Sequence, residues 1–194
     1  MALHILIAAT LSATAPAAKP VAPPPVVVAS SNAELKAMFD ADQAARAETS
    51  KVEPLDRYKA DHARRRRARE IMAVGQLKTG DDFYHAAFLF QHGEKAEDFL
   101  LAHALAMAGV AEGRKDARWI AAATLDRYLQ QLNQPQIFGT QFNTSLFEGT
   151  TQAPYDKAAL PDSVRAIFGV PPLADQEKRR ADMEAKFRAR YPKP

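Results

Sequence analysis

The segment from Thr79 to Gly113, TGDDFYHAAFLFQHGEKAEDFLLAHALAMAGVAEG, decides the fold of this chain. Two apolar stretches are separated by Gly93, and in the first of them Phe83, Ala87 and Phe90 recur at helical spacing. A helix that is apolar on nearly every side is a buried helix. We therefore predict a helical hairpin at the centre of the core, beginning at an N-cap at position 79 or 81.

The sequences on both sides of this hairpin predict five more helices, over residues 32–49, 55–74, 115–132, 161–168 and 174–190. Residues 31–34 fit a capping box, and Pro54 suits a first helical turn. The last helix has a sparse apolar seam of Met183 and Phe187, so we expect it to dock weakly or to fray. Near residues 136–155 the helical period is lost, which predicts either a short β-hairpin or an irregular loop.

Length and composition indicate one folded domain. The chain has 194 residues, of which 47% are hydrophobic and 25% charged. We expect a mostly α fold over residues 32–176, a single-domain helical bundle or α-hairpin stack of tetratricopeptide-like appearance, followed by a polar C-terminal helix or tail over 177–194. The absence of cysteine excludes disulfides, thiolate metal sites and a cysteine nucleophile.

The first 31 residues differ from the rest of the chain. The apolar run from Ile5 to Leu11 is followed by small residues at Ala13, Ala15 and Ala17, as at A-x-A cleavage sites. We predict a signal peptide over 1–18, a Pro/Ala-rich linker over 19–31, and a periplasmic or secreted protein. The alternative is a cytoplasmic protein with a disordered tail. The apolar run is too short to be a transmembrane segment.

Polar residues interrupt the inward face of the first predicted helix. Leu35 and Phe39 begin this face, and steps of three and four residues continue it to Asp42 and Arg46. Two interpretations stay open: an ion pair at the edge of the core, or a pair that lines a polar cavity. Gln43 is close enough on the helix to join either arrangement.

The histidines of the central hairpin do not suit a metal site. His85 and His92 are separated by about 10 Å along a helix axis, too far to share an ion. No HExxH, P-loop, GxGxxG or GxSxG pattern occurs in the chain. We expect no metal and no cofactor.

The row of arginines at 64–67 points in four directions around its helix. At least one of them must face a neighbouring element and needs a carboxylate partner there. No aromatic residues alternate with the row, and the formal charge of the chain is only +3. We therefore expect no nucleic-acid partner.

Several short motifs resemble a known family. The chain carries DQxxR at 42–46, AAxLxQH at 86–92, DR at 126–127, PQxxGTQ at 135–141 and GxPPL at 169–173. In this order and at these gaps they resemble the bacterial domain-of-unknown-function family 6624 over residues 33–176. The chain departs from the family's pattern with Gly75-Gln76-Leu77, where a Gly-Trp-Pro turn is expected. The resemblance implies a fold and a site map, but no reaction.

The motif residues and the inward polar residues together define a candidate site. His92 is the candidate general base, with Asp42 to orient it. The candidate ligand-binding residues are Gln43, Arg46, Gln91, Arg127, Gln136, Thr140 and Gln141. The alternative is that the same side chains form a structural hydrogen-bond network in the core.

Three functions are compatible with this sequence. The first is a helical binding or interaction module whose partner is an unknown small molecule or protein. The second is a small hydrolase or lyase that uses His92 on an anionic substrate. The third is a structural accessory protein whose basic second helix contacts an anionic surface.

Overall fold

A computed structural model of the protein describes residues 30–47 and 49–192. This part of the chain is mostly helical, as the sequence predicted, with one small sheet of two strands. The helices are α1 (Ala33–Ala44), α2 (Pro54–Ala73), α3 (Gly80–Phe90), α4 (Ala96–Ala111), α5 (Ala117–Gln131), α6 (Asp162–Ile167) and α7 (Leu173–Arg190). The strands are β1 (Asn143–Ser145) and β2 (Gly149–Thr151).

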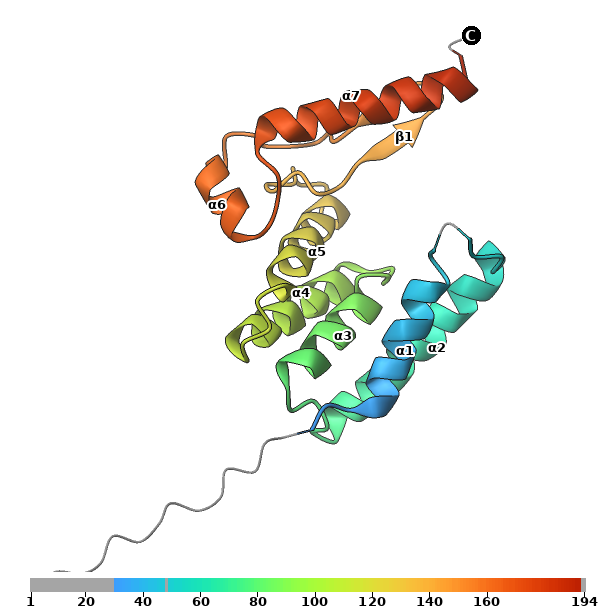
Figure 1. The fold of residues 1–194 in the computed structure, drawn as a ribbon, viewed down its shortest axis with the longest axis vertical. Helices are drawn as coiled ribbons and strands as arrows, with labels where there is room; N and C mark the ends of the chain where they lie inside the picture. The colour runs from blue at the N-terminus through green and yellow to red at the C-terminus, as the bar shows by residue number, and fades with distance from the viewer. Residues whose placement is uncertain (1–29, 48, 193–194) are drawn as a thin grey trace, which may run out of the picture.

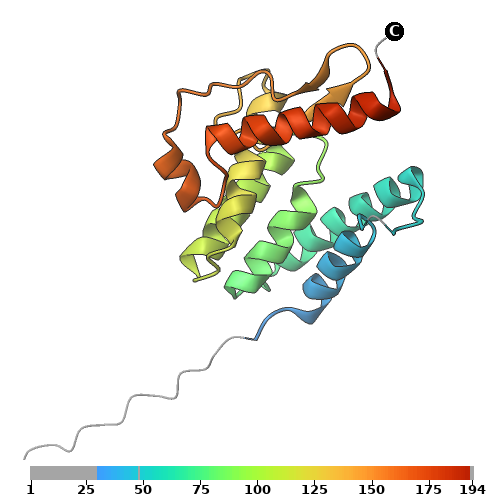
Figure 2. The same cartoon turned by 45° about the horizontal axis from the view of Figure 1, so that its top comes forward.

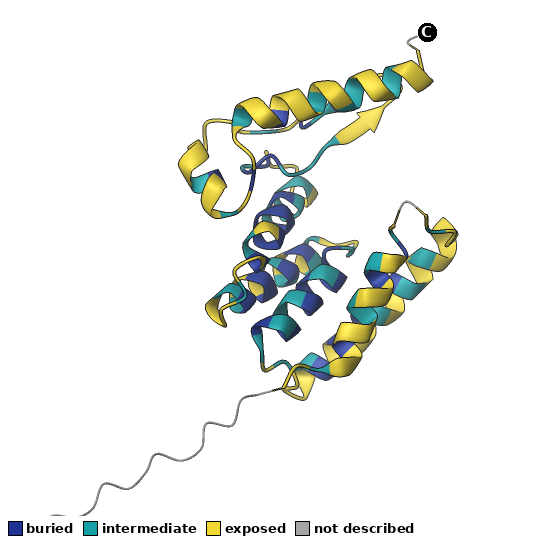
Figure 3. Ribbon diagram, viewed as in Figure 1, coloured by how far each residue is buried: buried dark blue, intermediate teal, exposed yellow. Residues whose placement is uncertain are grey.

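The core lies in the three consecutive helices α3, α4 and α5, which pack on one another in chain order (Figure 1). Buried residues gather in these helices, whereas α1, α2 and α7 are largely exposed on their outer sides (Figure 3). Many of the buried residues are alanines, among them Ala87, Ala102, Ala106 and Ala121. Small side chains let helix backbones approach closely, so the predicted central hairpin is confirmed as the core element.

Helices α1 and α2 lie side by side at one flank of the core (Figure 1). Leu35 is completely buried, and the ring of Phe39 meets that of Phe88 edge-on at 5.3 Å between centroids. Ile71 of α2 is buried in the same way. The inward face of α1 therefore packs on α3 as its apolar spacing predicts.

Helix α1 is shorter than predicted and ends at Ala44 rather than near residue 49. The main-chain N–H of Arg46 bonds to the carbonyl of Gln43, a tighter turn than that of an α-helix. At this point the Arg46 side chain bonds to both α1 and α2. The end of α1 thus coincides with the bond from Arg46 to Asp61 of α2, a contact that the local sequence pattern cannot predict.

The C-terminal segment forms a cap over one end of α5 (Figures 1 and 2). Strands β1 and β2 pair antiparallel, with Thr144 opposite Thr150, so of the two predicted alternatives a short β-hairpin forms here, flanked by irregular backbone. The C-terminal helix α7 runs beside β2. The cap thus joins residues that lie far apart in the sequence, such as Thr150 and Glu184, which are separated by 34 positions.

The prediction that the last helix docks weakly is wrong. Gln176 is buried and its amide donates to the carbonyl of Phe138 at 3.0 Å. Arg180 donates to the carbonyl of Thr150, and Glu184 accepts from the N–H of the same residue. Polar side chains of α7 form hydrogen bonds with the backbone of the 138 loop and of β2. The helix is therefore attached firmly although it has few apolar residues.

The predicted signal peptide and linker, residues 1–18 and 19–31, lie outside the described residues apart from positions 30 and 31. Within the described residues, none of the helices combines the length and the apolar character needed to cross a membrane.

Asp82 connects the beginnings of α1 and α3. Its completely buried carboxylate accepts hydrogen bonds from the Ser31 hydroxyl and from the N–H groups of Asn32, Lys78 and Thr79, at 2.7–3.0 Å. Burial by itself raises the pKa of Asp82, but these hydrogen bonds outweigh it and hold the pKa below its usual value. The capping box therefore lies at Thr79 and Asp82, whereas Asn32 caps α1 without a reciprocal partner.

We predict that Asp82→Asn lowers the free energy of unfolding by about 3 kcal/mol at pH 7, because an amide oxygen cannot accept from four donors as a carboxylate does. Since the folded-state pKa is lowered, the Asp82 contribution is present above about pH 4 and is lost as the pH falls further. Urea unfolding of both proteins at pH 7 and pH 3 measures this difference. An equal difference at the two pH values would contradict the assignment.

Candidate functional site

Asp42 is the buried centre of the candidate site. It lies on the inward face of α1 and is only 1% exposed. Its Oδ1 accepts from Arg46 Nη1 at 2.7 Å, and its Oδ2 accepts from Gln43 Nε2 at 2.8 Å. The i, i+4 spacing seen in the sequence therefore produces a charge-assisted hydrogen bond.

Arg46 also reaches α2, where its Nη2 donates to Asp61 Oδ2 at 2.6 Å. Arg64, one turn after Asp61, donates to Oδ1 of that carboxylate at 3.0 Å and lies 3.9 Å from Asp42 Oδ1. We call Asp42, Arg46, Asp61 and Arg64 the acid–arginine cluster. Two carboxylates face two guanidinium groups, so the cluster is neutral by itself.

Sequence reasoning did not place Asp61 and Arg64 in the site. Their i, i+3 spacing on a polar helix was the available signal, but such pairs are frequent on exposed helix faces. Only the position of α2 beside α1 distinguishes this pair from an ordinary surface pair.

His92 follows the end of α3 and approaches the cluster from the opposite side. Its Nε2 lies 3.5 Å from Asp42 Oδ2 and is buried without a hydrogen-bond partner among the described residues. Arg65 of α2 donates to the His92 carbonyl and pairs with Glu94 at 2.9 Å. The turn that carries His92 is thereby attached to α2, and Glu94 is one of the carboxylate partners expected for the arginine row.

Arg127 of α5 is the unbalanced charge of the site. Its Nε is buried and has no hydrogen-bond partner within the described parts of the chain. Burial, followed by the nearby positive charge of Arg46, lowers the pKa of Arg127. One guanidinium group from the turn after α1 and one from α5 therefore lie near each other, and only Arg46 has carboxylate partners in the described structure.

The rim of the site is accessible to a ligand. The side chains of Arg46 and His92 are 24% and 19% exposed, whereas that of Asp42 is 1% exposed. An approaching ligand would therefore contact the side chains of Arg46 and His92 before the Asp42 carboxylate. The carboxylate is placed to hold these groups rather than to meet the ligand itself.

Thr140 and Gln136 belong to a second network, which organises the loop after α5. The carboxylate of Asp126, completely buried, accepts from the N–H groups of Ile137, Phe138 and Thr140 and from the Thr140 hydroxyl, at 2.7–2.9 Å. Gln136 is also buried and bonds to the backbone of Gln141 and Gln152. Their polar atoms are used by the loop, so the structure does not bring them into the acid–arginine cluster.

Gln141 and Gln91 lie apart from the cluster in different ways. The Gln141 amide donates to the carbonyl of Ala123 at 3.3 Å, one helical turn before Arg127 on the same face of α5. Gln91 is buried at the end of α3, but it donates none of the hydrogen bonds that hold Asp42. Of these two, only Gln141 has a position that connects the loop with the Arg127 side of the site.

The other two hairpin histidines are placed in the helical packing. His85 lies 4.6 Å from the Phe39 ring, between centroids, and burial lowers its pKa. His103 Nδ1 is 2.9 Å from the carbonyl of Ala121. In the part of the chain that the structure describes, no three His, Asp or Glu side chains are grouped as metal ligands.

Comparison with family models, with curated proteins and with solved structures returned no match to this chain. The resemblance to family 6624 therefore stays a prediction from the sequence motifs.

We predict that Asp126→Asn destabilises the protein by about 3 kcal/mol, because buried N–H donors of the 137–140 loop lose a charged acceptor. Thr140→Val is the matched control: it removes one of the four donors to Asp126, together with the hydroxyl that accepts from the Gln141 amide, and is expected to cost about 1 kcal/mol. Amide hydrogen exchange should become faster at Ile137 and Phe138 in Asp126→Asn. Unchanged exchange at both amides would contradict the role given to Asp126.

Proposed function

We propose that this protein is a binding module for a small ligand with an anionic group, held between Arg46, His92 and Arg127. The observation that carries this proposal is the partly buried Arg127, whose Nε is buried without a hydrogen-bond partner among the described residues, beside the positive charge of Arg46. A guanidinium group without a partner is costly to bury, and a second guanidinium nearby adds repulsion. A carboxylate or phosphate between the two groups would compensate both costs and accept their hydrogen bonds.

The pairing of the α2 arginines supports a small anion over a large polyanionic surface. Arg64, Arg65, Arg67 and Arg69 of the basic helix are each paired with a carboxylate. Within the described residues this pairing leaves only Arg57, Lys59 and Arg66 of the seven cationic side chains of α2 without an ion pair, so the hypothesis of a structural accessory protein has less support.

We also propose, from the sequence of residues 1–18 alone, that the protein is periplasmic or secreted. Membership of family 6624 is proposed on the motif residues quoted above. The first of these proposals concerns where the binding module acts, and the second concerns which proteins share its site.

We predict that Arg127→Gln weakens binding of the anionic ligand by about 10- to 100-fold, because it removes a charged donor. The ligand-free variant should be at least as stable as the wild type, because an uncompensated buried charge has been removed. A thermal-shift screen of small carboxylates and phosphate esters identifies the ligand, and calorimetry measures its Kd.

Arg118→Gln is the matched control, because it makes the same charge change on the same helix and should leave binding unchanged. If Arg127→Gln binds as tightly as the wild type, or if no compound in the screen stabilises the wild type, the proposal fails.

A second candidate function is hydrolysis or elimination on the same anionic ligand, with His92 as general base. The observation that favours it is the unpartnered Nε2 of His92 at 3.5 Å from Asp42. Catalytic hydrogen bonds are often long before substrate binds, and a carboxylate beside an imidazole stabilises its protonated form.

If this second function holds, His92→Gln should lower turnover of the ligand by about 100-fold or more, a larger factor than the accompanying rise in its Kd. Incubation of the wild type with the ligand from the screen, followed by mass spectrometry, detects the product. Recovery of intact ligand after prolonged incubation with the wild type would leave only the binding module.

A further inference from the structure

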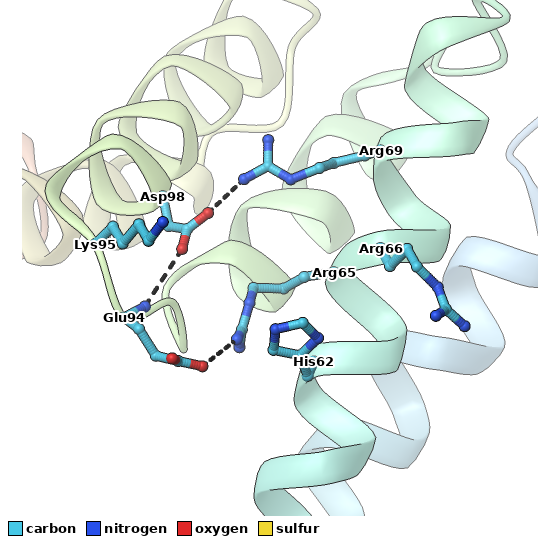
Figure 4. Close-up of a pocket in the computed structure, with 7 residues that line it drawn as sticks. All are labelled: His62, Arg65, Arg66, Arg69, Glu94, Lys95 and Asp98. Atoms are coloured by element: carbon cyan, nitrogen blue, oxygen red, sulfur yellow. Dashed lines mark hydrogen bonds and ion pairs between the residues drawn. The ribbon is translucent and has the colours of Figure 1, made fainter.

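A pocket lies between α2 and the turn that joins α3 to α4 (Figure 4). Its volume is about 320 Å³, at the lower end of the range for small-molecule sites. It is lined by His62, Arg65, Arg66, Arg69, Glu94, Lys95 and Asp98. We call it the α2–turn pocket.

The two carboxylates of this pocket are already occupied. Glu94 accepts from Arg65 at 2.9 Å and from the Tyr58 hydroxyl at 3.3 Å. Asp98 pairs with Arg69 and accepts from the N–H of Glu94 at 3.3 Å (Figure 4). These bonds neutralise Arg65 and Arg69 and fix the wall of the pocket.

Positive charge remains after this pairing. The lining residues include four arginine or lysine side chains and two carboxylates, which leaves a surplus of two positive charges. Within residues 30–47 and 49–192, Lys95 and Arg66 form no ion pair, and both are exposed. Figure 4 shows the His62 ring beside Arg65 and the Arg66 side chain extending away from Glu94. Arg66 is therefore free to turn toward a ligand.

We infer that the α2–turn pocket binds a phosphate group, with Lys95 and His62 as direct donors and Arg66 closing over it. A phosphate monoester carries a charge of about −1.5 to −2 at pH 7, which matches the surplus of the pocket. Ammonium and guanidinium groups are the usual phosphate donors in proteins. The pocket size suits the phosphate of a small ester rather than a long polyanion.

This inference does not rest on the proposed function, because the two sites use different cationic side chains. Arg127 and Arg46 belong to the first site, and Lys95 and Arg66 to the second. Arg65 has bonds in both regions, since it donates to the His92 carbonyl and to Glu94. It is excluded from the test for that reason.

The test is a ¹H–¹⁵N NMR titration of the whole chain at low ionic strength with inorganic phosphate and, separately, with glycerol 3-phosphate. Saturable shifts of the Lys95 and Ala96 amides are expected with at least one of them. Lys95→Gln should raise the Kd by about fivefold or more. Lys59→Gln removes an exposed lysine of α2 outside the pocket and should leave the Kd unchanged.

The two titrants separate the sources of the phosphate: shifts with glycerol 3-phosphate alone identify an ester site, and shifts with both identify a site for phosphate itself. The inference is overturned if neither titrant causes saturable shifts, or if Lys59→Gln weakens binding as much as Lys95→Gln. It is also overturned if Arg127→Gln, and not Lys95→Gln, abolishes the shifts, because the ion then occupies the first site.

Discussion

A buried carboxylate must be surrounded by hydrogen-bond donors, and three aspartates of this protein meet that constraint by joining separate parts of the chain. Asp82 connects the beginning of α1 to that of α3. Asp42 accepts from Gln43 of α1 and from Arg46 in the turn that follows, and Arg46 connects it to Asp61 of α2. Asp126 collects the loop that follows α5. Each is at most 1% exposed, so the loss of any donor leaves a charge that water cannot readily reach.

The apolar core explains the packing of the helices, but not how the outer elements are attached. Helices α3 to α5 approach one another through alanines, whereas α2 is attached to the turn after α3 through Arg65, and α7 to the loop through Gln176 and Arg180. Polar contacts therefore determine the positions of the elements that surround the candidate site. Since such contacts have strict geometry, they position functional groups more closely than apolar packing alone.

The helices and the Asp42–Arg46 part of the site could be predicted from the sequence. Apolar spacing predicted the central hairpin, and i, i+4 spacing predicted the pair of Asp42 and Arg46, because both are local properties of a helix. Asp61 was missed as a partner, since only the packing of α2 beside α1 brings it to Arg46. Thr140 was assigned to a ligand because polarity in a loop resembles a binding site, although its hydroxyl is used by Asp126. The prediction of weak docking for α7 was wrong because its hydrogen bonds to distant backbone produce no periodic pattern in the sequence.

The hydrogen bonds from Ser31 and Asn32 to Asp82 also fix the place at which the chain enters the folded domain. The chain enters the domain at Ser31 and Asn32, and Asp42 lies about 15 Å further along the same helix. Any segment that precedes residue 30 therefore joins the domain at the end of α1 remote from the acid–arginine cluster (Figure 1). If the protein were attached through that segment, Arg46 and His92 would lie at the end of α1 far from the attachment.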